Sequence, residues 1–537
     1  MTEQIPTPPE TETKSAGQQI ARAAGIAMIA YILSTLIGIV RGMVVSRVFG
    51  TSVALDSFNA ANRVTELLFN LTAGGALGSA FIPMFTGYLT RKDQKGAWRL
   101  ASGVVNSVLI VLVLVSVLMW IFAPFLVERG LFALVSDSNV VQVAETVRLL
   151  RIMLPTVIVF GLSGLVMGML NAHQIFLWPA VAPAAYSLGI ILGVLLLPAS
   201  WGINRLAIGT VIGALGHMLV QLPAFFRLPN RAYELAAGFK DLPVRKVLRL
   251  MLPRIFGAGI VQLNFMANTI ISLSLGAGSA SALTWAFTLM LMPQAAIAQS
   301  AGTASLPTLS AQVELGKFEE FKKTLAGILR VMLLLAIPAT VGLVLLRVPL
   351  VRVLYERGSF DATSTQMVAW ALLWYAVGLI GHSLVEVLSR AFYAMHDTKT
   401  PVLVGIAAMT GNILLSFAFS NLFSRVGWLP LGGLALANTA ATAVESLVLL
   451  ALMRRRLGGI NGKQLLKTTG LALAASVVMG AVLYAWMMLF GNGNKFLLLV
   501  GGALSGVLVY AAMIWVLKVP EIRMITLRLK RKMAEKG

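Results

Sequence analysis

Long apolar runs separated by short polar connections follow one another along nearly the whole chain. Each run is continuously apolar over about 20 residues, the length of a helix that crosses a membrane, and lacks the alternation of a membrane strand. We place fourteen such helices at 23–46, 56–82, 100–124, 146–169, 175–197, 205–226, 249–272, 281–305, 325–347, 366–389, 400–423, 432–453, 465–488 and 496–517. The pattern predicts an all-α polytopic membrane protein.

The composition supports this prediction and argues against several function classes. Of the 537 residues, 58% are hydrophobic and only 12% are charged, a share that is too small for a soluble domain. The chain has no cysteine and four histidines without metal-binding spacing, so we expect no metal centre and no cofactor. Nucleotide-binding and hydrolase motifs are missing from the sequence, which favours a transporter that is not an enzyme and does not use ATP directly.

The formal net charge of +22 is distributed unevenly between the connections. Basic residues gather after even-numbered helices, in the stretches 91–99, 227–249, 317–323 and 454–467. The positive-inside rule places these connections and both termini in the cytoplasm, so the charge does not indicate nucleic acid. We expect 1–20 to be a disordered cytoplasmic tail with no cleaved signal peptide, and 519–537 to be a basic cytoplasmic tail.

The chain resembles itself at a spacing of about 225 residues. "LVERGLF" at 126–132 matches "LYERGSF" at 354–360, and Pro83 and Pro307 precede similar polar loops. Each repeat holds six helices, which predicts two pseudo-symmetric lobes at 21–228 and 229–455 in a parallel repeat. Helices thirteen and fourteen, at 456–518, lie outside the repeat. This plan favours a two-lobed transporter over a receptor or a structural protein.

Ionisable side chains inside apolar helices are the first candidates for function: Arg41, Asp56, Arg63, Glu66, Arg151 and Arg254. A charge at the centre of a span costs about 3 kcal/mol on insertion scales, so it needs a partner or a watery cavity. Arg41 suits either a cavity ligand or a partnered structural charge. Arg63 and Glu66 are three residues apart and are predicted to pair. Asp56 is a candidate helix cap or gate residue, and Arg254 suits a snorkelling position.

Neutral polar side chains form a second group of candidates in the second lobe. Asn412 and Ser416 share one face of helix eleven, Thr439 lies in helix twelve, and Asn268 lies in helix seven. Interhelical hydrogen bonding is one interpretation of this group. A cation site among the three helices is the other.

Four sequence stretches together resemble the MurJ (MviN) lipid II flippase family of the multidrug/oligosaccharidyl-lipid/polysaccharide exporter superfamily. They are "RVFGTSVALDSFNAA", "GALGSAFIPMF", "LYERGSFDATST" and "RAFYAMHDTKTPV". The resemblance covers nearly the whole chain from about residue 20. It implies a flippase of the bacterial cytoplasmic membrane that moves undecaprenyl-pyrophosphate-linked peptidoglycan precursor to the outer leaflet by alternating access. It also implies a cationic cavity, a lipid-tail groove at helices thirteen and fourteen, and dependence on membrane potential or sodium.

The family's helix-one motif matches at Ser34, Gly38 and Arg41, which implies that Ser34 and Arg41 belong to the substrate cavity. Arg63, Glu66, Arg151 and Arg254 are the other cavity candidates. Three family arginines are replaced by Thr35, Phe69 and Thr288. The aspartate that binds sodium in some members is Asn268, whereas Asn412 matches, so we list Asn268, Asn412, Ser416 and Thr439 as a possible cation site.

Several functions stay open at the level of the sequence. The first is lipid II flipping, with lipid II and membrane lipids as partners and a monomer that associates with cell-wall synthesis proteins. The replaced arginines keep open a flippase for another polyprenyl-linked saccharide. A small-molecule or cation antiporter of the multidrug type and a scaffold in cell-wall synthesis are the remaining alternatives.

Overall fold

The structure is a computed structural model that describes Ala30 and residues 32–72, 75–135, 140–235, 238–239, 241–491 and 493–519. The predicted tails at 1–20 and from 520 onward lie outside these residues. The chain forms two compact units, Met1–Phe49 with Val53–Met266, and Gly50–Ser52 with Ala267–Gly537. The units divide inside one helix, α9. The lobe boundaries at 228 and 455, which rest on the sequence repeat, stay predictions.

The described residues are almost entirely helical, which confirms the all-α fold class. The helices of the first unit are Ile32–Phe49, α2 Val53–Thr72, α3 Gly75–Thr90, α4 Gln94–Phe125, α5 Val140–Ala172, α6 Leu177–Leu196, α7 Asn204–Leu219 and α8 Leu222–Phe225. Helix α9, Leu242–Ser274, crosses the unit boundary. The second unit holds α10 Ser279–Gln294, α11 Ser300–Glu314, α12 Phe318–Leu354, α13 Ala362–Ala394, α14 Lys399–Arg425, α15 Leu431–Arg456, α16 Gly462–Phe490 and α17 Gly502–Val516.

Twelve described helical segments are long and apolar enough to cross a membrane, so the chain is a multi-pass membrane protein. The predicted spans 56–82 and 249–272 are not among the twelve. They fall on α2 with α3, and on α9, which carry charged side chains within the helix: Asp56, Arg63, Glu66, Arg245, Lys246 and Arg249. The predicted count of fourteen spans is therefore not confirmed.

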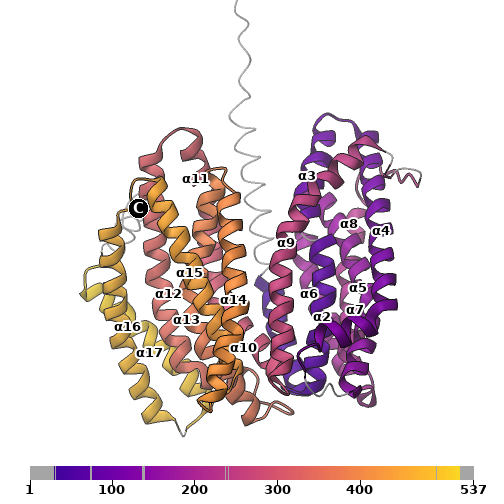
Figure 1. Cartoon of the computed structure of the whole chain (residues 1–537). Helices are drawn as coiled ribbons and strands as arrows, with labels where there is room; N and C mark the ends of the chain where they lie inside the picture. Colours follow the sequence, from indigo (N-terminus) through magenta and orange to yellow (C-terminus); the bar gives the residue numbers. More distant parts are fainter. Residues whose placement is uncertain are drawn as a thin grey trace, which may run out of the picture. The chain divides into compact units, whose positions relative to one another are not determined.

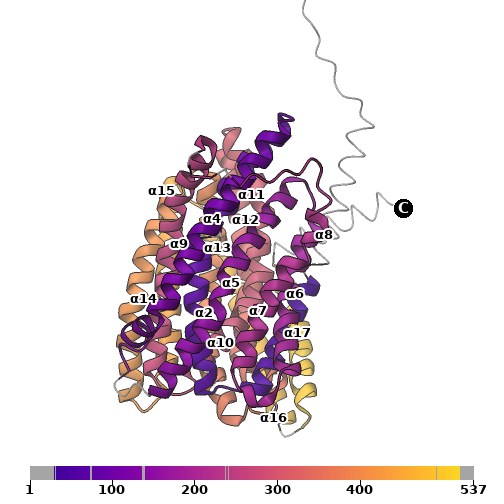
Figure 2. The same cartoon turned by 90° about the vertical axis from the view of Figure 1, so that its right-hand side faces the viewer.

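Helix α5 is the centre of the first unit and packs against α2, α3, α4 and α7 (Figure 2). Helices α6 and α7 approach each other backbone to backbone at two glycine pairs. A Cβ atom on Gly189 would lie 2.3 Å from the Cα of Gly213, and one on Gly193 would lie 2.3 Å from the Cα of Gly209. Small residues at such crossings are how membrane helices pack closely without a hydrophobic driving force.

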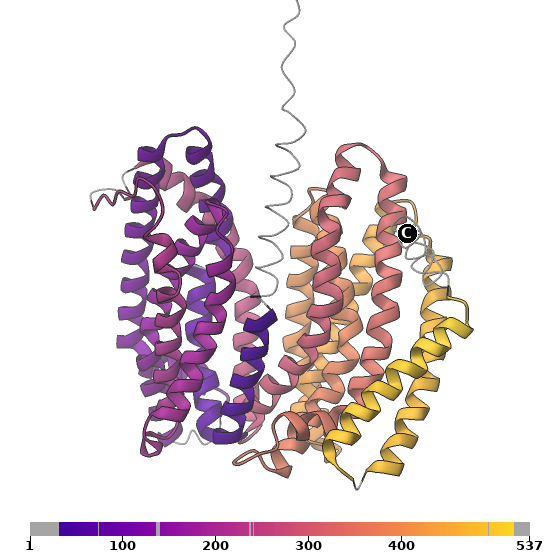
Figure 3. The same cartoon turned by 180° about the vertical axis from the view of Figure 1, so that it is seen from behind.

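Helix α13 has the same central role in the second unit, where it packs against α10, α11, α12 and α15 (Figure 1). Its first turn is capped by Asp361, whose carboxylate accepts a hydrogen bond from the Ser364 amide at 2.7 Å. Helix α14 packs mainly against α15. Helices α16 and α17 pack together and against α12 (Figure 3), and the Tyr510 hydroxyl donates to the carbonyl oxygen of Leu334 at 2.6 Å.

The connection between α13 and α14 is fixed by a partly buried carboxylate, Asp397. It accepts hydrogen bonds from the amide and the hydroxyl of Thr400, at 3.0 and 2.7 Å, and from Arg456. These donors favour the ionised form and lower the pKa of Asp397 from 3.8 to about 2. The Thr400 bonds are the largest cause, and the charge of Arg456 adds to them.

The internal repeat predicted from the sequence is also present in the backbone. Lys92 and Gly316, which precede α4 and α12, both adopt left-handed conformations with φ of 59° and 67°. Gln174 and His396, in the turns after α5 and α13, have φ of 60° and 58°. Gln174 and His396 are both non-glycine residues, which adopt this conformation uncommonly, so their matched occurrence at about the repeat spacing shows that the two halves share local geometry.

Candidate functional site

A polar cavity of about 320 Å³ lies in the first unit, between α2, α5, α6 and α7. Its walls are formed by Asn62, Thr65, Glu66, Phe69, Thr156, Val157, Phe160, Gly164, Met167, Pro183, Tyr186, Thr210 and His217. Hydroxyl, amide, imidazole and carboxylate groups alternate with aromatic rings on these walls. The lining combines polar groups with a larger apolar surface, which is typical of ligand pockets in proteins.

Arg41, on the first span, does not line this cavity but contacts one of the residues that do. Its guanidinium carbon lies 5.6 Å from the ring centroid of Tyr186, one of the lining residues, in a cation–π arrangement. Ser34, on the same helix, is buried, and its hydroxyl lies 2.8 Å from the carbonyl oxygen of Ala180 in α6. Ser34 therefore attaches the first span to α6, whereas Arg41 holds its charge beside the cavity.

Arg63 and Glu66 form the ion pair that their spacing predicts. The Arg63 Nη1 atom lies 2.8 Å from Glu66 Oε2, and the guanidinium also lies 5.1 Å from the Phe265 ring centroid. Glu66 accepts a second hydrogen bond from the Asn62 side-chain amide at 2.7 Å. Glu66 lines the cavity, and Arg63 lies behind it as its partner in the ion pair.

A hydrogen-bonded group of three further residues lies on the α5 and α7 side of the first unit. The Ser163 hydroxyl is 2.7 Å from His217 Nδ1, and the Gln221 side-chain amide donates to Ser163 at 2.8 Å. Sequence reasoning missed His217 and Tyr186 as cavity residues. The signal that could have found them is a histidine or tyrosine side chain within an apolar span.

The remaining candidates of the first unit lie away from these cavity walls. Arg151 stacks on the Trp120 ring with its guanidinium carbon 4.5 Å from the centroid, and its Nε donates to the Trp120 carbonyl oxygen at 3.1 Å. Asp56 is buried in the first turn of α2. Arg254 belongs to α9, but its side chain lies outside the described residues. Of the predicted residues, Glu66 lines the cavity, and Arg41 and Arg63 contact the lining residues Tyr186 and Glu66.

In the second unit, three of the four cation-site candidates meet. The Asn268 side-chain amide donates to Asn412 Oδ1 at 2.8 Å, and the Ser416 hydroxyl donates to Asn268 Oδ1 at 3.3 Å. Thr439 lies apart, because its hydroxyl donates to the Trp374 carbonyl oxygen at 2.7 Å. Amide and hydroxyl oxygens are ligands of hard cations, and the same groups also hold helices together.

Comparisons with known proteins show the family of the chain. The family model described as lipid II flippase MurJ matches residues 45–503. The chain belongs to the lipid II flippase MurJ family. The lipid II flippase MurJ of Burkholderia cenocepacia is 31% identical over 433 residues, which cover 79% of this chain and 82% of the relative. A probable lipid II flippase MurJ of Vibrio cholerae is 29% identical and covers 91% of this chain and 94% of the relative.

Solved structures place the fold in the same superfamily. The structure of a lipid II flippase MurJ in an inward closed conformation has a TM-score of 0.78 and 25% identity, and covers 92% of this chain and 99% of that chain. An inward-facing multidrug resistance transporter of the MATE family has a TM-score of 0.67 and 15% identity, over 81% of this chain and 98% of that chain. The second likeness shows the fold alone.

The structure shows where two residues that depart from the family pattern lie. Phe69, where the family resemblance expects an arginine, lines the polar cavity and packs on Phe160 with ring centroids 5.6 Å apart. Thr288, a second replaced arginine, lies in α10, where its hydroxyl donates to the Thr284 carbonyl oxygen at 2.8 Å. This MurJ family member therefore has an aromatic wall where a further cation is expected.

Proposed function

We propose that this chain is a lipid II flippase that moves its substrate from the cytoplasmic to the outer leaflet by alternating access. The observation that carries the proposal is the family match over residues 45–503, combined with two guanidinium groups that contact residues lining one cavity. A pyrophosphate headgroup cannot enter hydrocarbon without partners, because an unpaired charge there costs several kcal/mol. Arginine pairs with phosphate oxygens through two parallel donors.

Arg41 is the principal ligand of the pyrophosphate in this proposal. Its described contact is a cation–π interaction with Tyr186. This interaction is weaker than a charge-assisted hydrogen bond, so the N–H groups of Arg41 suit an anionic acceptor. Arg63 is the second ligand and changes partner when substrate binds. Glu66 then loses its ion pair but keeps the hydrogen bond from Asn62.

The membrane topology completes the proposal. We infer that α2 with α3, and α9, cross the membrane as well, which gives fourteen spans and two cytoplasmic termini. Support comes from the basic connections after even-numbered spans, which the positive-inside rule assigns to the cytoplasm. Helices α16 and α17, packed on α12 outside the repeat, hold the polyprenyl chain.

The other candidate residues take supporting roles. Asn268, Asn412 and Ser416 form a cation site linked to membrane potential or sodium, supported by their mutual hydrogen bonds. Thr439 contributes through the neighbouring helix. Asp56 acts as a gate residue, and Ser34 positions the first span. Arg151 and Arg254 bind substrate phosphates outside the main cavity, and the chain acts as a monomer beside cell-wall synthesis proteins.

The test uses bacterial cells whose own lipid II flippase can be depleted. The chain should restore growth, and lipid II should become accessible to an impermeant lipid II-degrading enzyme added outside the cells. Arg41→Ala, present at equal membrane levels, should restore neither. Normal membrane insertion without any externalised lipid II would reject the proposal.

A flippase for a different polyprenyl-linked saccharide is the second candidate. Phe69 and Phe160 favour it, because they present an aromatic surface to the cavity where the family resemblance expects a cation. Aromatic faces bind sugar and lipid groups more readily than phosphates. This candidate predicts externalisation of another glycolipid in cells where lipid II stays inside.

A further inference from the structure

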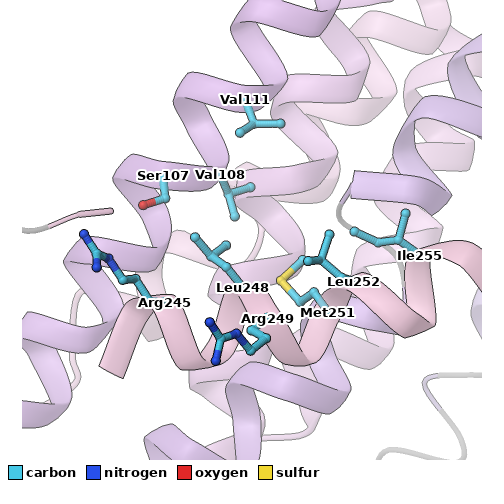
Figure 4. A pocket seen from close by; sticks show the side chains of 9 residues that line it. All are labelled: Ser107, Val108, Val111, Arg245, Leu248, Arg249, Met251, Leu252 and Ile255. Atoms are coloured by element: carbon cyan, nitrogen blue, oxygen red, sulfur yellow. The ribbon is translucent and has the colours of Figure 1, made fainter. Parts of the chain in front are cut away.

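A second pocket of the first unit, of about 430 Å³, lies between α4 and the start of α9 (Figure 4). Its lining residues are Ser107, Val108, Val111, Arg245, Leu248, Arg249, Met251, Leu252 and Ile255. None of these residues lines the polar cavity described above. The pocket is therefore a separate feature that lipid II translocation, as proposed here, does not use.

The pocket is apolar along most of its length and polar at one end. Ser107 and Arg245 lie at one end, whereas Met251, Leu252 and Ile255 extend toward the other (Figure 4). Arg245 and Arg249 are four residues apart on α9, so they share one helix face. A pocket with two guanidinium donors at one end and apolar side chains at the other fits the phosphate and the acyl chain of a phospholipid.

The polar end contains an unsatisfied buried group. Ser107 is 0% exposed, and its hydroxyl has no hydrogen-bond partner among the residues that the structure describes. Such a group costs about 1–3 kcal/mol unless a ligand or water completes it. Neither Arg245 nor Arg249 has an acidic partner within the described ranges, and Arg245 uses its Nε on the Phe239 carbonyl oxygen at 2.6 Å. All three groups thus have donors to offer an anion.

The apolar end is exposed on the surface of the first unit. Val111 is 37% exposed and Leu252 is 53% exposed, and the neighbouring Ile110 and Leu114 on α4 are more than half exposed. Exposed apolar side chains on a membrane helix suit contact with lipid chains, so this end of the pocket fits an acyl chain.

The connection that leads into α9 is hydrogen-bonded to α4 beside the polar end of the pocket. Asn106 on α4 donates to the carbonyl oxygens of Glu234 and Leu235 at 3.1 and 3.2 Å, and Arg99 pairs with Asp241 at 3.1 Å. This connection belongs to the basic set that we assigned to the cytoplasm. The placement of the polar end at the cytoplasmic interface rests on that proposed orientation.

We propose that this pocket binds an anionic glycerophospholipid of the cytoplasmic leaflet. Its phosphate accepts hydrogen bonds from Arg245, Arg249 and Ser107, and one acyl chain lies along Val111 and Leu252. Basic pockets between membrane helices on the cytoplasmic side have the charge complementarity that anionic headgroups need. The bound lipid fills the space between α4 and α9 and attaches α9 to the first unit.

The test exploits the absence of cysteine from the chain. Val111→Cys, and separately Leu252→Cys, carry a bimane fluorophore in the full-length purified protein in nanodiscs. Spin-labelled phosphatidylglycerol and spin-labelled phosphatidylcholine, with the same acyl chains, are the quenching probes. Leu403→Cys is the control reporter for ordinary annular lipid, because Leu403 on α14 is 65% exposed.

We expect phosphatidylglycerol to quench both pocket reporters at about tenfold lower mole fraction than phosphatidylcholine, and no such preference at Leu403→Cys. The double variant Arg245→Gln/Arg249→Gln should lose this preference, and Ser107→Ala should reduce it about threefold. Lys246→Gln, on the same helical turn but outside the lining, is the matched control and should keep it.

Three results would overturn the proposal. One is equal quenching by the two lipids at the pocket reporters. Another is a preference that survives the double arginine variant, and the third is displacement of the labelled lipid by undecaprenyl phosphate or inorganic phosphate as readily as by phosphatidylglycerol. Size-exclusion profiles show whether each variant is folded. The lipid II externalisation test is independent, so failure of one proposal is distinguishable from failure of the other.

Discussion

The two halves of the chain share local backbone geometry but differ in the chemistry of corresponding helices. Pro83 and Pro307 are 224 residues apart, as are the left-handed residues Lys92 and Gly316. At the same spacing, the charged residues of α2 correspond to apolar residues of α10: Arg63 to Phe287, and Glu66 to Met290. Phe287 packs on Tyr375 with ring centroids 5.2 Å apart, and Met290 is fully buried.

This difference shows that the charged residues of α2 have no charged counterparts in α10. In the first unit, Glu66 lines the cavity, and Arg41 and Arg63 contact lining residues. The second unit has a neutral cluster of Asn268, Asn412 and Ser416. In the proposed function, guanidinium groups of the first unit bind phosphate, and amide and hydroxyl oxygens of the second unit bind a cation.

Removal of the charge beside the cavity is expected to have the largest effect. Arg41→Ala deletes a charge-assisted interaction that contributes about 1.5–3 kcal/mol, so lipid II externalisation should fall about 10- to 100-fold. Arg47→Ala, six residues further along the same helix, is the matched control because Arg47 is exposed. Equal activity of the Arg41 variant and the wild type would show that the charge of Arg41 does not contribute to lipid II transport.

The ion pair on α2 offers the next test, because its two members are predicted to act in opposite directions. Arg63→Gln should weaken lipid II binding about tenfold, whereas Glu66→Gln should strengthen it about threefold, because the competing carboxylate is lost. Native mass spectrometry of both variants measures this split. If both variants weaken binding to the same extent, the pair is structural and the proposed exchange of partners is wrong.

The neutral cluster can be converted into a charged one to sharpen the comparison. Asn268→Asp places a carboxylate against Asn412 and Ser416, which destabilises the protein when no cation pairs with it. With sodium at about ten times its dissociation constant, binding should restore about 1.4 kcal/mol, or about 1 °C in melting temperature. Asn268→Ala is the control and should not respond to sodium. Identical melting in sodium and potassium would exclude a cation site here.

The smallest effect concerns the turns after α5 and α13. Asp397 and Ile175 occupy corresponding positions, and their amides donate to the Phe392 and Leu170 carbonyl oxygens at 3.0 and 2.9 Å. Because the folded pKa of Asp397 is lowered to about 2, its stabilisation is present above pH 4 and is lost as the pH falls toward 2.

Asp397→Asn should therefore lower the unfolding free energy by about 1 kcal/mol at pH 7, after allowance for solvent screening. The difference between variant and wild type should shrink as the pH falls below about 4, which melting curves followed by tryptophan fluorescence can measure. A difference that stays constant between pH 7 and pH 3 would show that Asp397 acts through packing. Ile175→Val is the control in the first half and should show no pH dependence.

The sequence was sufficient for the fold class, because apolar runs of membrane length are a direct consequence of bilayer thickness. It was less reliable for the charged helices, since α2 and α9 combine apolar residues with several charges. Helix bounds also differed: α9 begins at Leu242, so Arg245 and Arg249 belong to the helix rather than to a loop before it.

The site was predicted only where the relevant contact is local. Arg63 and Glu66 are three residues apart, and helix periodicity alone predicts their pair. The contact between Arg41 and Tyr186, and that between Asn268 and Asn412, join residues more than 140 positions apart. Periodicity does not encode such contacts. Arg151 shows the same limit, because its position on Trp120 depends on how α4 and α5 pack.

The central claim is that the charge of the first unit recognises a pyrophosphate lipid. The most direct measurement uses native mass spectrometry. It compares the binding of lipid II and of undecaprenyl phosphate to the wild type, Arg41→Ala and Asn268→Ala. The account predicts that the wild type prefers lipid II, that Arg41→Ala loses this preference, and that Asn268→Ala retains it. Equal binding of both lipids by the wild type, or the same loss in both variants, would contradict the account.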